Sequence, residues 1–415
     1  MARRRPALLD ELVEEIVLRF PADDPASLVR AALVCKSWCR LISSPRFRRR
    51  FREFHRSAPM LGFLLDLRNN DDKSYIARFV PTSSSCPTHA DRRGFALDAR
   101  HGRVLLYTAR ETDHPVLPRY DFVIWNPIND QVQELPAFNW YRHSKAPWKA
   151  AVLCADTAAG TCDHLACHNE PFLVVFVGIL IDFVFVHVYS SETRTWSRVI
   201  TDGTVGPPNC WVSMTGPSVL AESALHFAID GGRRILSYDI SKRSLSVSNT
   251  PWNHRMGKVD IITGEDGRLG VAGVEGYKLL LWSSCAISPD NNDNNVRIWK
   301  VGRIIELDMM LSIDIGVPMT TFHVVGFAEG ANTIFICGSD GIYAVALESG
   351  HVRKAHERTH FFGIVPYVSF CIPVENGRRI FRYDVSMGVM VVLTALWKNT
   401  RMGNIGPIID KDGGL

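Results

Sequence analysis

Apolar side chains recur at helical spacing in the first fifty-odd residues. Leu8, Leu12 and Ile16 follow one another every four residues, which predicts an amphipathic helix that Pro21 ends. Asp24-Pro25 then combines an N-cap residue with proline at the first helical position, a typical helix start. Further apolar positions up to Phe54 predict a third helix and a last, basic one. We therefore expect a small all-α module at this end of the chain.

From about Gly62 onward the pattern changes to short β-type runs separated by polar turns. A loose unit of three strands recurs five times, roughly 45–65 residues apart, which is the spacing of propeller blades. The five units cover residues 102–136, 172–199, 224–247, 268–301 and 333–354. The predicted fold is mostly β: the helical module is followed by a β-propeller.

Residues near both ends of the β region supply material for a closing blade. Residues 61–65 and 76–80 would join residues 366–371, because such closure hides the last sheet edges. We expect about six blades, with five to eight possible, and with a sandwich array or a partly open sheet stack as alternatives. The predicted domains are 1–58, 59–375 and a C-terminal extension, 376–415, that forms an extra strand pair or a helix before a frayed tail.

Charge is unevenly distributed along the chain. Residues 1–60 hold 13 Lys and Arg against 7 Asp and Glu, whereas the remainder is slightly acidic. This balance disfavours a nucleic-acid footprint on the long domain. The basic cluster between Arg46 and Arg52 could serve nuclear import or contact phosphates, but a solvated helix face is the preferred interpretation.

A long apolar run beginning at Phe172 approaches the length of a membrane span. It is rich in valine and phenylalanine and is interrupted by Asp182, which predicts two buried strands joined by a turn. No secretory signal is visible, and the ten cysteines show no framework spacing. We expect no membrane segment, reduced thiols, and a cytoplasmic and/or nuclear location.

Candidate chemistry is sparse. The densest set of potential metal ligands is Cys154, Cys162, His164, Cys167 and His168, but its spacing departs from the paired ligands of structural zinc sites. Loop thiols are the preferred interpretation over zinc, so no metal and no cofactor are predicted. No nucleophile elbow, phosphate loop or dinucleotide fingerprint is present. We predict no enzyme and no catalytic residues.

Aromatic side chains in the stretches between the predicted blades are candidate contact residues. Loops of this kind rim one face of a propeller, where exposed aromatics make good anchors. The alternative is that each aromatic packs beneath its own loop. The candidate target-binding residues are Trp140, Tyr141, Trp148, Trp211, Trp252 and His254.

The helical module resembles the F-box. The resemblance rests on the run from Leu8 to Ile16, then Leu28, then residues 33–38 and 41–47. It implies docking on the Skp-type adaptor of a cullin–RING ubiquitin ligase. The family usually has Leu-Pro where this chain has Leu8-Leu9, a departure that would weaken docking without abolishing it. By position, the residues at or beneath the adaptor interface are Leu8, Leu9, Leu12, Ile16, Leu28, Val34, Cys35, Lys36, Trp38 and Ile42.

The β region resembles the F-box-associated domain of plant F-box proteins, which is kelch-like. The resemblance rests on residues 124–127, 188–193 and 367–370. It implies a substrate-recognition subunit of a Skp–cullin–F-box ubiquitin ligase that presents a target protein. The alternatives are an F-box scaffold without ligase output and a propeller enzyme that acts on carbohydrate.

Overall fold

A computed structural model describes the chain in segments. They are residues 9–69, 74–83, 91–110, 119–137, 147–158, 162, 164, 167, 170–179, 183–202, 214–252, 259–264, 266–289, 295–307, 322–357, 361–373, 380–384 and 389–393. Four helices come first and six four-stranded sheets follow. The predicted fold class, a small helical module before a β-propeller, is confirmed, and the number of blades is six.

The four helices are α1 (Asp10–Val17), α2 (Pro25–Val34), α3 (Lys36–Ser43) and α4 (Pro45–His55). Proline occupies the first turn of both α2 and α4, as the sequence predicts for α2. Ser44 caps α4, because its hydroxyl accepts a hydrogen bond of 3.1 Å from the backbone N–H of Phe47. These short helices share one apolar core, and each is too short to be stable alone.

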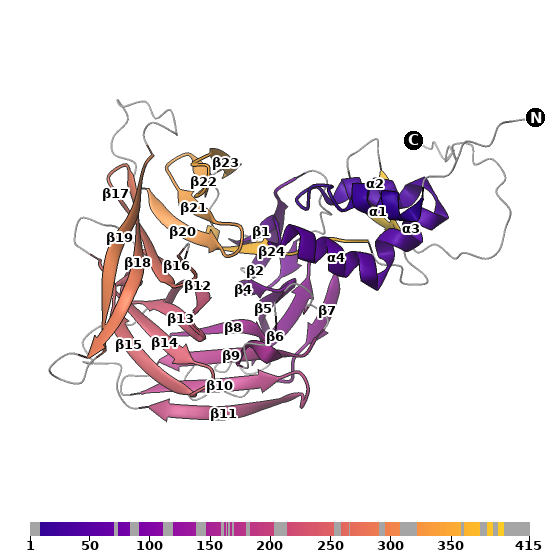
Figure 1. Cartoon of the computed structure of the whole chain (residues 1–415). Helices are drawn as coiled ribbons and strands as arrows, with labels where there is room; N and C mark the ends of the chain where they lie inside the picture. Colours follow the sequence, from indigo (N-terminus) through magenta and orange to yellow (C-terminus); the bar gives the residue numbers. More distant parts are fainter. Residues whose placement is uncertain are drawn as a thin grey trace, which may run out of the picture.

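Each blade is a four-stranded antiparallel sheet, and the six blades stand around a central axis (Figure 1). The first blade combines β24 (Phe361–Val368), β1 (Met60–Arg68), β2 (Tyr75–Pro81) and β3 (Arg92–Arg93). The second holds β4 (Phe95–Arg100), β5 (Arg103–Arg110), β6 (Arg119–Asn126) and β7 (Gln131–Glu134). The third holds β8 (Trp148–Cys154), β9 (Phe172–Ile179), β10 (Val184–Ser190) and β11 (Thr195–Asp202).

The remaining three blades follow in chain order. The fourth holds β12 (Met214–Ala221), β13 (Ala224–Ile229), β14 (Arg234–Asp239) and β15 (Ser244–Asn249). The fifth holds β16 (Asp260–Thr263), β17 (Leu269–Glu275), β18 (Lys278–Pro289) and β19 (Asn295–Glu306). The sixth holds β20 (His323–Ala328), β21 (Thr333–Cys337), β22 (Gly341–Ala346) and β23 (Val352–Glu357). The first strand of each blade contacts the first strand of the next, and β24 contacts both β20 and β4, so the ring closes.

Ring closure joins segments from opposite ends of the β region, as predicted. Strand β1 pairs antiparallel with β2 on one side and with β24 on the other, where Phe63 lies opposite Pro366 and Leu64 opposite Val365. The first and last parts of the propeller are therefore hydrogen-bonded within one sheet. This pairing holds the first blade in place between the sixth blade and the second.

The hydrophobic core consists of clusters between neighbouring blades and within the helical module. The apolar run after Phe172 forms β9 and β10, which pair with Ile179 opposite Val184, so the prediction of two buried strands is confirmed. Among the described residues, no helix has the length and hydropathy needed to cross a membrane.

The helical module packs against the blade that closes the ring (Figure 1). Beyond β24 the chain continues to Phe370 and Ile372, which join the core of the four helices. Phe51 of α4 meets Phe370 edge-on with 6.2 Å between the ring centroids. Within the extension, β25 (Ile380–Asp384) and β26 (Val389–Leu393) form a separate two-stranded sheet near α2, which is the strand pair among the predicted alternatives.

Candidate functional site

One face of α1 carries exposed apolar side chains. Leu9, Leu12 and Ile16 are 66%, 52% and 52% exposed, whereas Val13 and Val17 on the opposite face are fully buried. The spacing of the two sets follows the helical period, so the buried set fills the module's core. The exposed set has no apolar partner within this cluster. A helix that is apolar on two faces is typical of one that is covered by a second molecule.

The corner between α2 and α3 extends this apolar face. Leu33 and Val34 end α2 with 50% and 64% of their surface exposed, and the neighbouring Cys35 and Lys36 are exposed as well. The Ser37 hydroxyl donates to the Asp10 carboxylate over 3.3 Å, which holds this corner beside the start of α1. We call the whole surface the docking face; it consists of Leu9, Leu12, Ile16, Leu33, Val34, Cys35 and Lys36.

The other residues that the F-box resemblance selected lie beneath this face or outside the described part of the chain. Leu28 and Ile42 are buried in the module's core, and Trp38 is half-buried against it. Leu8 lies outside the described residues. Leu33 was missed as a site residue, although its place one position before Val34 at the end of α2 could have indicated it.

The basic residues of α4 serve the module itself. Arg50 pairs with Glu14 and Glu15 of α1, each over 2.7 Å, and the pKa of the Glu15 carboxyl is lowered by Arg50 and then by Arg19. Arg52 is buried. The prediction of a simple solvated face therefore holds for only part of this cluster, because Arg50 ties α4 to α1 and Arg52 is withdrawn from solvent.

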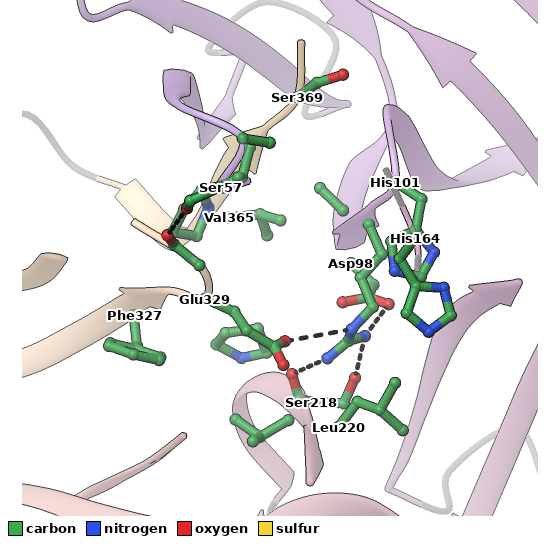
Figure 2. Close-up of a pocket in the computed structure, with 18 of the residues that line it drawn as sticks. Ser57, Asp98, His101, His164, Ser218, Leu220, Phe327, Glu329, Val365 and Ser369 are labelled. Atoms are coloured by element: carbon green, nitrogen blue, oxygen red, sulfur yellow. Dashed lines mark hydrogen bonds and ion pairs between the residues drawn. The ribbon is translucent and has the colours of Figure 1, made fainter. Parts of the chain in front are cut away.

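A pocket of about 340 Å³ opens where the end of α4 meets the propeller axis (Figure 2). Arg100, at the end of β4, is its central charge. The guanidinium donates to the Asp98 carboxylate and, over 3.0 Å, to the Ser218 hydroxyl, and its Nε lies 3.7 Å from the Glu329 carboxylate. Asp98 also accepts a hydrogen bond of 2.8 Å from the backbone N–H of Val152 in the next blade.

Burial governs the electrostatics of this pocket. It raises the pKa of the Asp98 carboxyl, and the positive charge of Arg100 opposes that rise. The surrounding protein likewise raises the pKa of Glu329, although 40% of that side chain remains accessible through the pocket. Through its hydrogen bond to Ser218 and its ion pair with Glu329, Arg100 links the second, fourth and sixth blades. The sequence analysis did not identify these pocket residues. The one local pattern that could have indicated them is Asp98-x-Arg100, which puts both charges on one side of a strand.

Two of the predicted target-binding aromatics fall within the described residues. Trp148 is the first residue of β8 and packs between blades against Phe122 and Phe176, so it does not stand on a loop at the rim. Trp252 is half-buried, with the Arg233 guanidinium 4.1 Å from its ring centroid. The other candidates, Trp140, Tyr141, Trp211 and His254, lie outside the described residues.

The cysteine-rich stretch is brought together more tightly than its spacing suggests. The donor atoms of Cys154, Cys162, His164 and Cys167 all lie within 4.8 Å of one another. His168 lies outside the described residues. Unrelated loop thiols, the interpretation preferred from the sequence, do not explain why these four donor atoms lie so close together.

Comparison with known proteins gives one family match. Residues 7–50 match the F-box domain, and this match covers α1, α2, α3 and the first part of α4. An F-box domain in front of a six-bladed propeller is an architecture that fits ubiquitin-ligase substrate receptors in general. No curated protein matches the chain significantly.

Several solved structures resemble the propeller at a distance. A protein from Lactobacillus plantarum is 11% identical with a TM-score of 0.40, covering 80% of this chain and 94% of that one. TolB from Acinetobacter baumannii is 11% identical with a TM-score of 0.35, covering 77% and 69%. A chain of a nidogen/laminin complex is 9% identical with a TM-score of 0.40, covering 75% and 99%. Likenesses at this level carry no functional information.

Proposed function

We propose that this protein is the substrate-recognition subunit of a Skp–cullin–F-box ubiquitin ligase. Residues 1–58 would dock on the Skp-type adaptor, and residues 59–375 would hold a target protein. The observation that carries the proposal is the docking face: five exposed aliphatic side chains on a module that matches the F-box domain. The protein itself would supply proximity between target and ubiquitin-transfer machinery and no covalent chemistry.

The composition of the docking face supports a protein partner. Large aliphatic side chains that are half or more exposed are costly in water, at about 25 cal/mol for each Å² of apolar surface. Such a patch with a charged rim is typical of a protein–protein interface. Lys36 and the acidic side chains of α1 supply that rim here. The substitution of Leu9 for the usual proline leaves this surface apolar.

The connection between module and propeller supports the receptor role. Ile372 is buried among the helices although it follows the last propeller strand, and the Ser57 hydroxyl donates to the carbonyl of Gly330 in the sixth blade over 2.6 Å. We call this junction the clasp; it consists of Phe51, Ser57, Gly330, Phe370 and Ile372. A docked adaptor would therefore face the propeller in a fixed direction, as target presentation requires.

The proposal also covers the type of β domain, its location in the cell and the loops that bind the target. The β domain would be the F-box-associated, kelch-like domain of a plant protein, acting in cytoplasm or nucleus. The target would contact loops that hold Trp140, Tyr141, Trp211, Trp252 and His254. Trp148 is better assigned to blade packing. A scaffold without ligase output remains the rival, and accumulation of a captured target after depletion of this protein would favour the ligase role.

The decisive experiment measures the affinity of the intact chain for a purified Skp-type adaptor. Leu12→Asp and Ile16→Asp each place a charge on the docking face, so we expect each to weaken binding at least about 100-fold. Phe54→Asp is the matched control, because Phe54 is 51% exposed on α4 outside that face. Unchanged affinity in both docking-face variants, or an intact, folded chain that binds no adaptor, would overturn the proposal.

A further inference from the structure

The segment between β8 and β9 gathers three thiols and an imidazole next to the second blade. Cys154 ends β8, and Cys162, His164 and Cys167 follow within thirteen residues. All four donor atoms lie within 4.8 Å of one another, and the Sγ of Cys167 is 3.8 Å from Nδ1 of His164. Cys154 and Cys167 are buried, whereas Cys162 and His164 are half-buried.

Zinc coordination needs little movement of these atoms. Zn–S bonds of about 2.3 Å and Zn–N bonds of about 2.0 Å place tetrahedral ligands about 3.5–3.8 Å apart. The observed spread of up to 4.8 Å therefore requires a contraction of at most about 1.3 Å. Three cysteines and one histidine are among the ligand sets of closed structural zinc sites. Soft thiolate ligands in a tetrahedral set select zinc over the hard cations magnesium and calcium.

Arg103 of β5 supplies a second, independent observation. Its side chain is buried, and Nη2 donates to the carbonyl of Cys167 over 2.7 Å and to that of Glu170. Its Nη1 is buried without a hydrogen-bond partner among the described residues. An anionic group at the cluster would balance the buried positive charge of the Arg103 guanidinium.

We propose that Cys154, Cys162, His164 and Cys167 form a structural zinc site. Three thiolates and a neutral imidazole around Zn²⁺ carry one net negative charge, and Arg103 offsets that charge. Each thiol releases its proton to solvent as zinc binds.

The site would anchor the segment between β8 and β9 at the mouth of the pocket on the propeller axis. His164 stacks on His101 with 4.3 Å between the ring centroids and 4° between the ring planes, and both rings line that pocket (Figure 2). A zinc ion bound to His164 would therefore fix the orientation of two pocket side chains. This role is independent of adaptor docking.

The test is metal analysis of the full chain, purified under reducing conditions without chelator. We expect about one zinc per chain, and Co²⁺ substitution should produce the absorption of tetrahedral thiolate-bound cobalt. Cys162→Ser and His164→Asn, both at half-buried positions, should lower zinc retention at least about 10-fold during dialysis against a chelator. Cys285→Ser, an exposed cysteine on β18, is the matched control and should retain the metal.

Four results would overturn the assignment. One is a folded wild-type chain that binds neither Zn²⁺ nor Co²⁺. Another is equal retention in the Cys162, His164 and Cys285 variants, with circular dichroism showing that all are folded. The third is a disulfide among Cys154, Cys162 and Cys167 in intact-mass analysis of the chain as isolated from cells. The fourth is iron or copper at one equivalent in place of zinc.

Discussion

Removing the side chain of Ile372 should loosen the helical module while leaving the propeller intact. Ile372 is 8% exposed and belongs to the core formed by the four helices. Ile372→Ala removes three carbon atoms, worth about 0.8 kcal/mol each on transfer to water, and leaves a cavity. We expect the free energy of opening the module to fall by about 2–4 kcal/mol. At 1.4 kcal/mol for each factor of ten, amide exchange in α4 should accelerate about 30-fold to several-hundred-fold.

Hydrogen exchange of the full chain measures this effect locally. The amides of Phe47 and Phe51 in α4 report on the module, and those of β9 report on the propeller. Ile304→Ala is the matched control, because the same three carbons leave a side chain that is 52% exposed on β19. Equal exchange of α4 amides in the Ile372 variant and in the wild type would refute the reasoning that the clasp stabilises the module.

Three further predictions concern the propeller. Gly178→Ala should destabilise the fold by about 1–3 kcal/mol, because the new Cβ would lie 2.1 Å from the Phe185 ring; Gly302→Ala, with 3.6 Å to its nearest neighbour, is the control in thermal unfolding. Burial lowers the pKa of His226 to about 4, so its stabilising contribution is full above about pH 6.5 and is lost as the pH falls toward 4. In denaturant titrations between about pH 4 and 6.5, His226→Gln should remove about 3 kcal/mol of the change in unfolding free energy with pH. The same pH dependence in the variant and the wild type would contradict a buried, neutral His226. Burial raises the pKa of the Asp66 carboxyl, so the stability that the protonated side chain contributes is lost as the pH rises through its pKa in the folded state. The melting temperature of Asp66→Asn should therefore increase relative to that of the wild type as the pH is raised.

The sequence predicted the outer three strands of five blades and missed most of their innermost strands, whereas in the closing blade it predicted β24, β1 and β2 and missed the outermost strand, β3. Strands such as β5 and β6 contain nearly continuous apolar runs, because one side of their sheet packs against the first blade and the other side against the third. The innermost strands face the axis and carry charge, as Asp98 and Arg100 do on β4, or glycine and proline, as Gly216 and Pro217 do on β12. Their apolar pattern is therefore broken at the positions by which a strand is recognised.

The docking face was easier to predict than the pocket. Leu12 and Ile16 lie one turn apart on a single helix, so a local pattern identifies them. Arg100, Ser218 and Glu329 come from three blades and meet only after the ring has closed. The cysteine cluster is an intermediate case, since its members are close in sequence but converge through the packing of β8 and Arg103.

The clasp also has a consequence for the order in which the protein is made. The helices are synthesised first, yet Ile372, a residue of their core, follows the last propeller strand. At translation rates of about 5–20 residues per second, this contribution arrives on the order of tens of seconds after α4. A nascent or prematurely terminated chain would thus carry a weakened helical module. The helices would reach full stability only after the ring had been completed, so under the proposed function an unfinished chain would bind the adaptor less well than a finished one.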